Sequence, residues 1–299
     1  MPELPDIQLY LHALTPRVLG KPIVKIRVAS PFVLRTFDPP IEMLEGRFVR
    51  TVTRLGKRIV FGFDGELFLI VHLMVAGRFR WSDKPGTKLT GKIGLASFNF
   101  PHGTLLLVES SPKKRAGMWV IHGKDELAKH DPGGLDIFNI TPTEFAHQLQ
   151  KENHTLKRSL TDPRLFDGIG NAYSDEILHA ASLSPVKLSQ SLNEEETDRL
   201  LSACRITLGR WTGHLINEFA DRFPGPGDVT AFRPDFAVHG KFGEPCPVCE
   251  TKIQRIRYAE NETNYCPRCQ TGGKLLADRS LSRLLKKDWP KTIEELEEK

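Results

Sequence analysis

Residues 246–269 read CPVCETKIQRIRYAENETNYCPRC, a stretch that begins and ends with a Cys-x-x-Cys pair. Each pair can present two thiolates from one tight turn, and the spacing of the four cysteines fits a tetrahedral zinc ribbon. The sixteen residues between the pairs are enough for the two strands of a β-hairpin. We therefore predict one structural Zn²⁺ ion that holds this hairpin together, bound by Cys246, Cys249, Cys266 and Cys269.

The predicted zinc module carries several positive charges. Four thiolates leave no open position on the ion, so its role is structural and not catalytic. Arg255, Arg257 and Arg268 lie in or beside the hairpin, in a chain with a formal net charge of +5. These arginines are either a contact with nucleic acid or an ordinary solvated face.

The part of the chain before the cysteine segment divides into a β-rich half and a helical half. Residues 22–119 contain short runs rich in β-branched and aromatic residues, separated by Gly, Asp and Pro, which predicts a sandwich or barrel. Apolar residues recur every three to four positions over residues 5–19, so a helix should pack on the sheets, kinked or shortened by Pro16. The turn-rich residues 130–136 mark a domain boundary.

The helical half shows recognisable helix starts. Thr141 and Ser191 are each followed three residues later by glutamate, which predicts two capping boxes. Between them, the GIGN turn at 168–171 precedes a helix that ends before Pro185. The fifth cysteine, Cys204, lies in an apolar helical run, where a small buried thiol is favoured over a reactive one.

Bulk properties limit the class of protein. At 299 residues the chain should form two domains with appendages, and 39% hydrophobic with 26% charged residues is typical of a globular protein. The sequence has no apolar run of membrane-spanning length and no signal-peptide pattern at its N-terminus. We expect no contact with a membrane and a cytoplasmic protein.

The second residue offers unusual chemistry. If Met1 is removed, as a small second residue generally permits, Pro2 carries a secondary amine next to the carboxylate of Glu3. An α-amino group titrates near ~7.7–8.0, so part of it is neutral and nucleophilic at physiological pH. Attack on a sugar C1′ would give an iminium, and a nearby acid could protonate the leaving or ring oxygen. By itself the motif is weak, because many chains begin in this way.

Five segments, taken in order and at their spacing, resemble the bacterial formamidopyrimidine-DNA glycosylase and endonuclease VIII family. They are MPELPDI at the N-terminus, RLGKR around Lys57, VHL with His72, GIGNAYSDEILHAASLSP at 168–185, and HGKFGEPCPVC with NYCPRC in the cysteine segment. Each segment is weakly specific, but the combination is highly specific. The resemblance covers about residues 1–270.

The resemblance implies an α+β multi-domain fold. Its parts are an N-terminal β-sandwich catalytic domain with a flanking helix at 1–130, a linker at 131–140, a helix-two-turn-helix domain at 141–237 and a four-cysteine zinc-finger β-hairpin at 238–270. A charged tail at 271–299 follows and lies outside the resemblance. It implies a monomeric, nucleoid-associated enzyme that holds damaged or abasic double-stranded DNA between its halves. The implied activity is base excision by a bifunctional glycosylase with β/δ lyase activity.

Matching positions imply roles for five residues. Pro2 becomes the Schiff-base nucleophile and Glu3 the acid that assists ring opening and base release. Lys57 matches the β-hairpin lysine near the lesion phosphate. His72 and Asn171 match residues that hold phosphates around the flipped nucleotide. Without the resemblance, His72 would be interpreted as a core histidine and Lys57 as a solvated lysine.

Several DNA-binding positions depart from the family pattern. Asn261 stands where the zinc-finger arginine is usual, so a fixed cation is missing there. Val75 stands where a methionine fills the void left by the flipped base, with Met74 one place earlier. A second loop of the family also fills this void, and Lys113, Lys114 and Arg115 stand at its position here. They keep the positive charge of the loop, but no aromatic residue stands at the expected place.

Two further departures concern the damaged base. Asp6 replaces a usual glutamate, and residues 223–239 look shorter than the family loop that caps oxidised guanine. These departures concern lesion recognition, so the sequence does not decide which lesion is preferred. Pro2 and Glu3 are intact, so the predicted chemistry is unaffected. The alternatives are a damage-binding protein with weak or lost catalysis, and a zinc-ribbon transcription or RNA-binding protein, which would leave the N-terminal motif unexplained.

Overall fold

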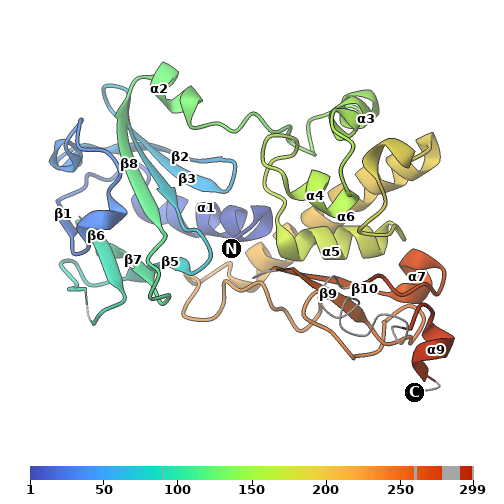
Figure 1. Ribbon diagram of the computed structural model, residues 1–299. Helices are drawn as coiled ribbons and strands as arrows, with labels where there is room; N and C mark the ends of the chain where they lie inside the picture. Colours follow the sequence, from blue (N-terminus) through green and yellow to red (C-terminus); the bar gives the residue numbers. More distant parts are fainter. Residues whose placement is uncertain (90, 259–260, 278–289, 298–299) are drawn as a thin grey trace. The chain divides into compact units, whose positions relative to one another are not determined.

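The computed structural model describes residues 1–89, 91–258, 261–277 and 290–297 (Figure 1). The chain divides into two compact units, each made of two separate segments. The first unit combines Met1–Pro132 with Trp211–Ala231, and the second combines Gly133–Arg210 with Phe232–Lys299. Helix α6 (Glu194–Glu218) therefore begins in the second unit and ends in the first.

The first unit is built on two four-stranded antiparallel sheets, which confirms the predicted N-terminal β-sandwich. The strand orders are β1-β6-β7-β5 and β2-β3-β4-β8. Strands of the first sheet are β1 (Lys25–Val28), β6 (Gly94–Phe100), β7 (Gly103–Glu109) and β5 (Gly77–Ser82). Strands of the second sheet are β2 (Val49–Leu55), β3 (Arg58–Phe63), β4 (Leu67–His72) and β8 (Gly117–His122). Shorter helices of this unit are η1 (Pro31–Val33), η2 (Ile41–Leu44) and α2 (Lys124–Lys129).

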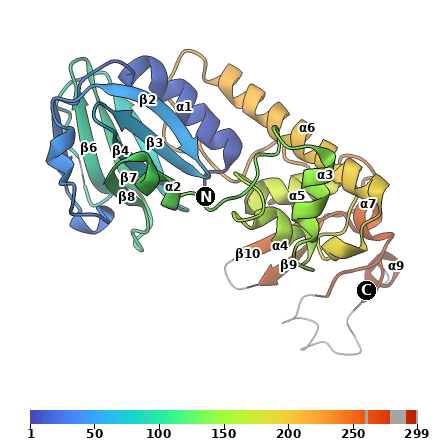
Figure 2. The same cartoon turned by 90° about the horizontal axis from the view of Figure 1, so that it is seen from above.

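Apolar side chains from both sheets meet in one core. Phe61 of β3, Phe79 of β5 and Phe98 of β6 belong to the same buried cluster, together with residues of helix α1 (Leu4–Val18). Figure 2 shows α1 along β2 and β3, both of which it contacts. Because successive strand residues point to opposite faces, Val60 and Ile70 instead join a smaller cluster on the other face of their sheet.

Helix α1 continues through Pro16 and ends at Val18. The expectation that Pro16 would shorten it was therefore wrong. Proline removes one backbone donor, but it lies in the last turn, where Arg17 Nη1 donates to Ala13 O (2.8 Å) and Thr15 Oγ1 to Leu11 O (2.7 Å). The bond that Pro16 itself removes is the one to His12 O, and the two side-chain bonds are made to the carbonyls on either side of it.

The second unit is helical and ends in a small zinc module. Its helices before the module are α3 (Pro142–Gln150), α4 (Leu156–Thr161), α5 (Asn171–Ala180), η3 (Ser189–Ser191) and the first part of α6. The module contains the antiparallel hairpin β9 (Gln254–Tyr258) and β10 (Asn261–Tyr265), followed by α7 (Pro267–Thr271), and α9 (Ile293–Glu297) comes later in the chain. Helix α5 contacts α4 as well as β10 and α7 (Figures 1 and 2). The hairpin between the cysteine pairs is therefore confirmed.

The two predicted capping boxes have different outcomes. At α3, Glu144 N–H donates to Thr141 Oγ1 (3.2 Å) and Thr141 N–H to Glu144 Oε2 (2.8 Å), as predicted. At α6 the box is formed by Asn193 and Glu196, with bonds of 2.8 and 3.2 Å, so the prediction of Ser191 was wrong. Ser191 ends the 3₁₀ turn η3, where its hydroxyl bonds to Leu188 O.

Candidate active site and zinc centre

The amino-terminal end of α1 places Glu3 and Asp6 in a fixed arrangement. Glu3 is the N-cap residue of α1, and its N–H donates to Asp6 Oδ2 (2.9 Å) in a capping box. Pro2, Glu3 and Asp6 are all buried. Asp6 thus closes the box that a glutamate at the third helical position usually closes.

The chain's first nitrogen lies in an environment that favours a neutral amine. Burial lowers the pKa of the Met1 amino group, and the positive charges of Arg78 and Lys57 act in the same direction, against Glu3 and Asp6. The structure therefore brings the N-terminus, Glu3 and Lys57 to one place in the first unit. A larger unprotonated fraction at neutral pH means a larger nucleophilic fraction.

Lys57 and His72 lie at the same end of the second sheet. Lys57 is in the two-residue turn between β2 and β3, which requires the left-handed backbone of Gly56 (φ 63°). Arg58 pairs with His72 in the β3–β4 register. Burial, with the charges of Arg58 and Lys57, lowers the pKa of His72 to about 4. His72 is thus a neutral imidazole at pH 7, and can hold a phosphate only by hydrogen bonding.

The two predicted void-filling segments are surface loops of the first unit. Val75 lies in the β4–β5 turn and is 58% exposed, next to Met74 in a left-handed conformation (φ 52°). In the β7–β8 loop, the buried carboxylate of Glu109 accepts from the N–H groups of Arg115 and Ala116, at 3.0 Å each. Lys114 turns back to donate to Glu109 O, whereas Lys113 and Arg115 are exposed.

In the second unit, Asn171 begins α5 and belongs to a buried polar network. Lys157 Nζ donates to Asn171 O (2.7 Å) and to Asp175 Oδ1 (2.5 Å). The other carboxylate oxygen of Asp175 lies 2.7 Å from His239 Nδ1 and accepts from Asn264 N–H (3.1 Å). The network fixes the helix end that carries Asn171, where backbone N–H groups can face a phosphate.

The adjacent Glu176 attaches the zinc module to the same helix. Its buried carboxylate accepts from three successive N–H groups, those of Ala237 (2.7 Å), Val238 (2.9 Å) and His239 (2.8 Å). Burial raises the pKa of Glu176, and the three bonds oppose this effect. Sequence reasoning missed Lys157, Asp175, Glu176 and His239. A signal was present, since two adjacent acids, Asp175 and Glu176, stand in the middle of the predicted helix.

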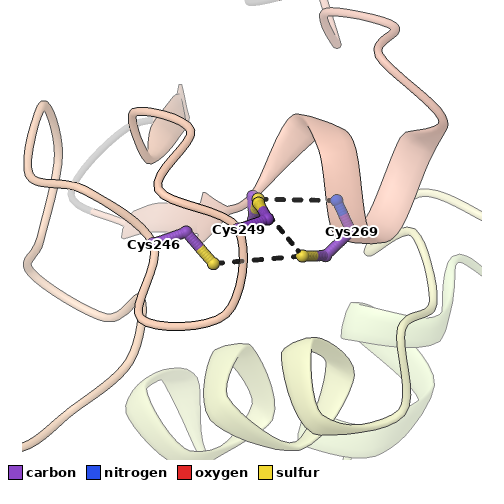
Figure 3. A group of neighbouring side chains, drawn as sticks. Cys246, Cys249 and Cys269 are labelled. Carbon is purple, nitrogen blue, oxygen red and sulfur yellow. Dashed lines mark hydrogen bonds between the residues drawn. The ribbon is translucent and has the colours of Figure 1, made fainter.

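The four cysteines meet as the zinc prediction requires. Their sulfur atoms lie within 4.8 Å of one another and form no disulfide. The Cys246–Cys269 and Cys249–Cys269 sulfur atoms are 3.9 and 3.4 Å apart. Dashed lines mark these two contacts in Figure 3. Zn–S bonds of about 2.3 Å in a tetrahedron give sulfur–sulfur distances of about 3.8 Å, so the cluster fits the ion. The chain therefore has one structural zinc site.

A histidine from α5 completes the surroundings of the metal ligands. His179 Nε2 lies 3.3 Å from Cys246 Sγ, and burial lowers the pKa of His179. A neutral imidazole with its proton on Nε2 would donate to this sulfur, and such outer contacts orient metal ligands. The fifth cysteine, Cys204, is fully buried, as predicted.

The arginines of the hairpin are paired within the module. Arg255 and Arg257 both approach Glu262 Oε2, at 3.3 and 3.4 Å, and Arg255 also stacks on Phe242 (4.1 Å to the ring centroid). Arg257 nevertheless stays 62% exposed, so the choice between a nucleic-acid contact and a solvated face stays open for it. Asn261 begins β10 opposite Tyr258, and its side chain lies outside the described part of the chain.

We expect Cys249→Ser to lower the zinc content well below one ion per chain and to weaken DNA binding about tenfold or more, while the first unit stays folded. The physical reason is that the hairpin loses its metal, and one charge-assisted contact is worth about 1.5–3 kcal/mol. Elemental analysis and equilibrium DNA binding measure the two effects. Cys204→Ala is the matched control and should keep its zinc. Wild-type protein without stoichiometric zinc would contradict the assignment.

Comparisons with known proteins agree with this arrangement. Family models match the formamidopyrimidine-DNA glycosylase N-terminal domain at residues 1–131, the H2TH domain of that glycosylase at 136–210, and a zinc finger found in FPG and IleRS at 243–272. Formamidopyrimidine-DNA glycosylase of Laribacter hongkongensis is 32% identical over 278 residues, which cover 90% of this chain and all of the relative.

Solved structures show the same similarity. Lactococcus lactis formamidopyrimidine-DNA glycosylase bound to DNA with an AP site is 25% identical, with a TM-score of 0.78 over 90% of this chain and 99% of that chain. The same protein with DNA containing an oxidized pyrimidine gives 25% identity and a TM-score of 0.79 over 90% and 100%. In the described ranges of the present chain, no helix is long and apolar enough to cross a membrane.

Proposed function

Because the chain belongs to the formamidopyrimidine-DNA glycosylase family, whose members remove damaged bases from DNA, we propose that Pro2 is its nucleophile. The observation that carries the proposal is the grouping of the buried Pro2 and Glu3 with the charge of Lys57 at the N-terminus of the first unit. The proposal requires that Met1 is removed, because the Pro2 nitrogen is an amide as long as Met1 is attached.

The proposed reaction joins Pro2 to the sugar. The lone pair of the Pro2 nitrogen attacks C1′, and the C1′–N bond breaks with its electron pair going to the base. The C1′–O4′ bond then breaks with its electron pair going to O4′, the Pro2 nitrogen gives up its proton, and an iminium joins Pro2 to C1′. Glu3 passes protons to the departing base and to O4′. In the iminium that results, loss of a proton from C2′ expels the 3′ phosphate, which nicks the strand. A further elimination would release the 5′ phosphate.

The proposed DNA contacts come from both units. Lys57 and His72 of the first unit and Asn171 of the second would hold phosphates around the lesion. Flipping the nucleotide leaves a void in the duplex, and the exposed Val75 would fill it. The β7–β8 loop and the zinc hairpin would add contacts through Lys113, Lys114, Arg115 and Asn261. We also propose a cytoplasmic, nucleoid-associated location.

The function is tested by incubating the protein with labelled duplexes that contain an abasic site, 8-oxoguanine or an oxidised pyrimidine. Base release and strand cleavage are separated by analysing products with and without alkali. Duplexes of these kinds are bound by the relatives whose structures are known. Binding without cleavage of any substrate would support the damage-binding alternative.

Electrostatics gives a second expected result. Lys57→Ala should weaken binding of all duplex sequences alike and reduce the salt slope of the binding constant by about 1, because Lys57 would contact a phosphate and not a base edge. Titrations between about 50 and 200 mM salt measure the slope. Lys21→Ala, at an exposed lysine that follows α1, should leave the slope unchanged. A sequence-dependent loss would contradict the phosphate assignment.

A further inference from the structure

The chain continues beyond the zinc finger that the family model matches, which ends at residue 272. The structure describes residues 273–277 and 290–297 of this continuation, and we call these two segments the clasp. Gly273 has a positive φ of 87°, and its N–H donates to Pro267 O at the start of α7 (3.0 Å). The chain therefore turns back toward the zinc module as soon as α7 ends.

The two segments of the clasp pair with each other. Leu275 N–H donates to Lys291 O (2.8 Å), and Ile293 N–H donates to Gly273 O (3.0 Å), in an antiparallel arrangement. This pairing places the start of α9 next to Gly273, which follows directly after α7. A part of the chain that is distant in sequence is thereby returned to the metal ligands.

A hydrogen bond joins the clasp to the residue before the third cysteine. Leu276 N–H donates to the hydroxyl oxygen of Tyr265 (2.8 Å). Tyr265 is the last residue of β10, is 1% exposed and directly precedes Cys266. Because its ring is fixed by burial, this bond connects the clasp to the position of a zinc ligand.

Helix α9 lies beside segments that belong to both cysteine pairs. Ile293, which is 5% exposed, and Leu296 line a groove together with Pro267, which stands between the cysteines of the second pair. The same groove is lined by Thr251 and Lys252, which come shortly after the first pair. The burial of Ile293 is favourable only while these segments keep their places.

The clasp contacts bear on release of the metal. Each cysteine pair supplies two thiolates, so the ion leaves when the two pairs move apart. Contacts that are lost on such local opening raise the free energy of the open state and lower its population. Since metal binding and folding of the site share one free energy, the same contacts favour retention of the ion.

We propose that the clasp holds the two cysteine pairs together, so that loss of its contacts speeds the loss of zinc from the module. The inference is independent of the proposed glycosylase reaction, because it concerns the zinc site alone. The competing interpretation is a tail that lies on the surface of a module already closed by its metal. The two interpretations differ in the rate of metal release that they predict.

The first test is Ile293→Asn in the full chain. Transfer of zinc to an excess of a chromophoric chelator is followed by absorbance, and it should be about tenfold faster than in the wild type, because the buried apolar side chain is lost. Ile206→Asn is the matched control, since Ile206 lies on α6 and is 68% exposed. This control should release zinc at the wild-type rate.

The second test is Tyr265→Phe, which keeps the buried ring and removes the acceptor of Leu276 N–H. Zinc transfer should be about twofold to tenfold faster, the usual effect of one hydrogen bond. Elemental analysis before the measurement should find one zinc per chain. This variant decides the matter if Ile293→Asn does not fold.

The wild-type protein supplies a third test without substitution. With zinc bound, the amide hydrogens of Leu275, Leu276 and Ile293 should exchange slowly with solvent, because each has an acceptor within the second unit. Removal of zinc should make these amides exchange about tenfold faster or more, whereas those of β4 in the first unit should keep their rates. Hydrogen exchange followed by NMR gives the comparison.

Three results would overturn the inference. Wild-type rates of zinc transfer in both folded variants would show that the clasp does not hold the metal site. Equal acceleration by Ile206→Asn would assign the effect to any polar substitution. Fast exchange of the three clasp amides in the zinc-bound wild type would show that the clasp is open in solution.

Discussion

Incubation of the mature protein with an abasic-site duplex and borohydride is expected to give a covalent protein–DNA adduct through the Pro2 nitrogen. Hydride reduces the iminium to a stable amine, so the adduct survives denaturing electrophoresis. Pro2→Gly should reduce the yield strongly without necessarily abolishing it, since a primary amine can still form a Schiff base from a less constrained position. Mass spectrometry of the adduct locates the modified nitrogen.

The control is a chain that keeps Met1, in which the Pro2 nitrogen is an amide and cannot attack. This form should give no adduct and should still bind DNA. If the chain that keeps Met1 still forms a borohydride adduct, the nucleophile would be a lysine. Lys57→Ala would then be the next variant to examine. An intact N-terminal proline that gives no adduct on any lesion or abasic substrate would favour the damage-binding alternative.

Glu3→Gln is expected to slow excision of an intact damaged base by about 10²–10⁴-fold, the usual contribution of a general acid. Glutamine keeps the shape of the N-cap side chain but cannot supply the proton. Cleavage at a preformed abasic site needs no base departure, so it should suffer less. Single-turnover rates on both substrates give the comparison.

Glu42→Gln, an exposed glutamate in η2, is the matched control for loss of one carboxylate and should match the wild type on both substrates. Equal losses on the two substrates for Glu3→Gln would mean that Glu3 acts on the iminium steps and not on base release. No loss on either substrate would remove Glu3 from the mechanism.

The sequence predicted most clearly what depends on local spacing. The four cysteines, the hairpin between them and the Thr141 capping box are set by residues a few positions apart, and the structure confirms them. The β-rich runs and turn residues indicated a sandwich or a barrel, and the family resemblance implied the sandwich. Pro16 was misjudged because a proline in the last helical turn removes few hydrogen bonds.

The parts that sequence reasoning missed depend on contacts between distant positions. Asp175 bonds to His239 and Asn264, which lie 64 and 89 positions further along the chain. Arg78 reaches Val229 across 151 positions. A single sequence does not record such pairs. The roles of the site residues and the domain boundaries at 130, 140, 237 and 270 stay predictions.

Asp175 and Glu176 attach the zinc module to α5, and this attachment couples the binding of zinc to the binding of DNA. The ion stabilises the module, and the module bonds to the helix whose first residue is Asn171. If zinc favours DNA binding by some free energy, bound DNA must favour retention of zinc by the same amount. The complex on damaged DNA would then hold its metal more tightly than the free enzyme.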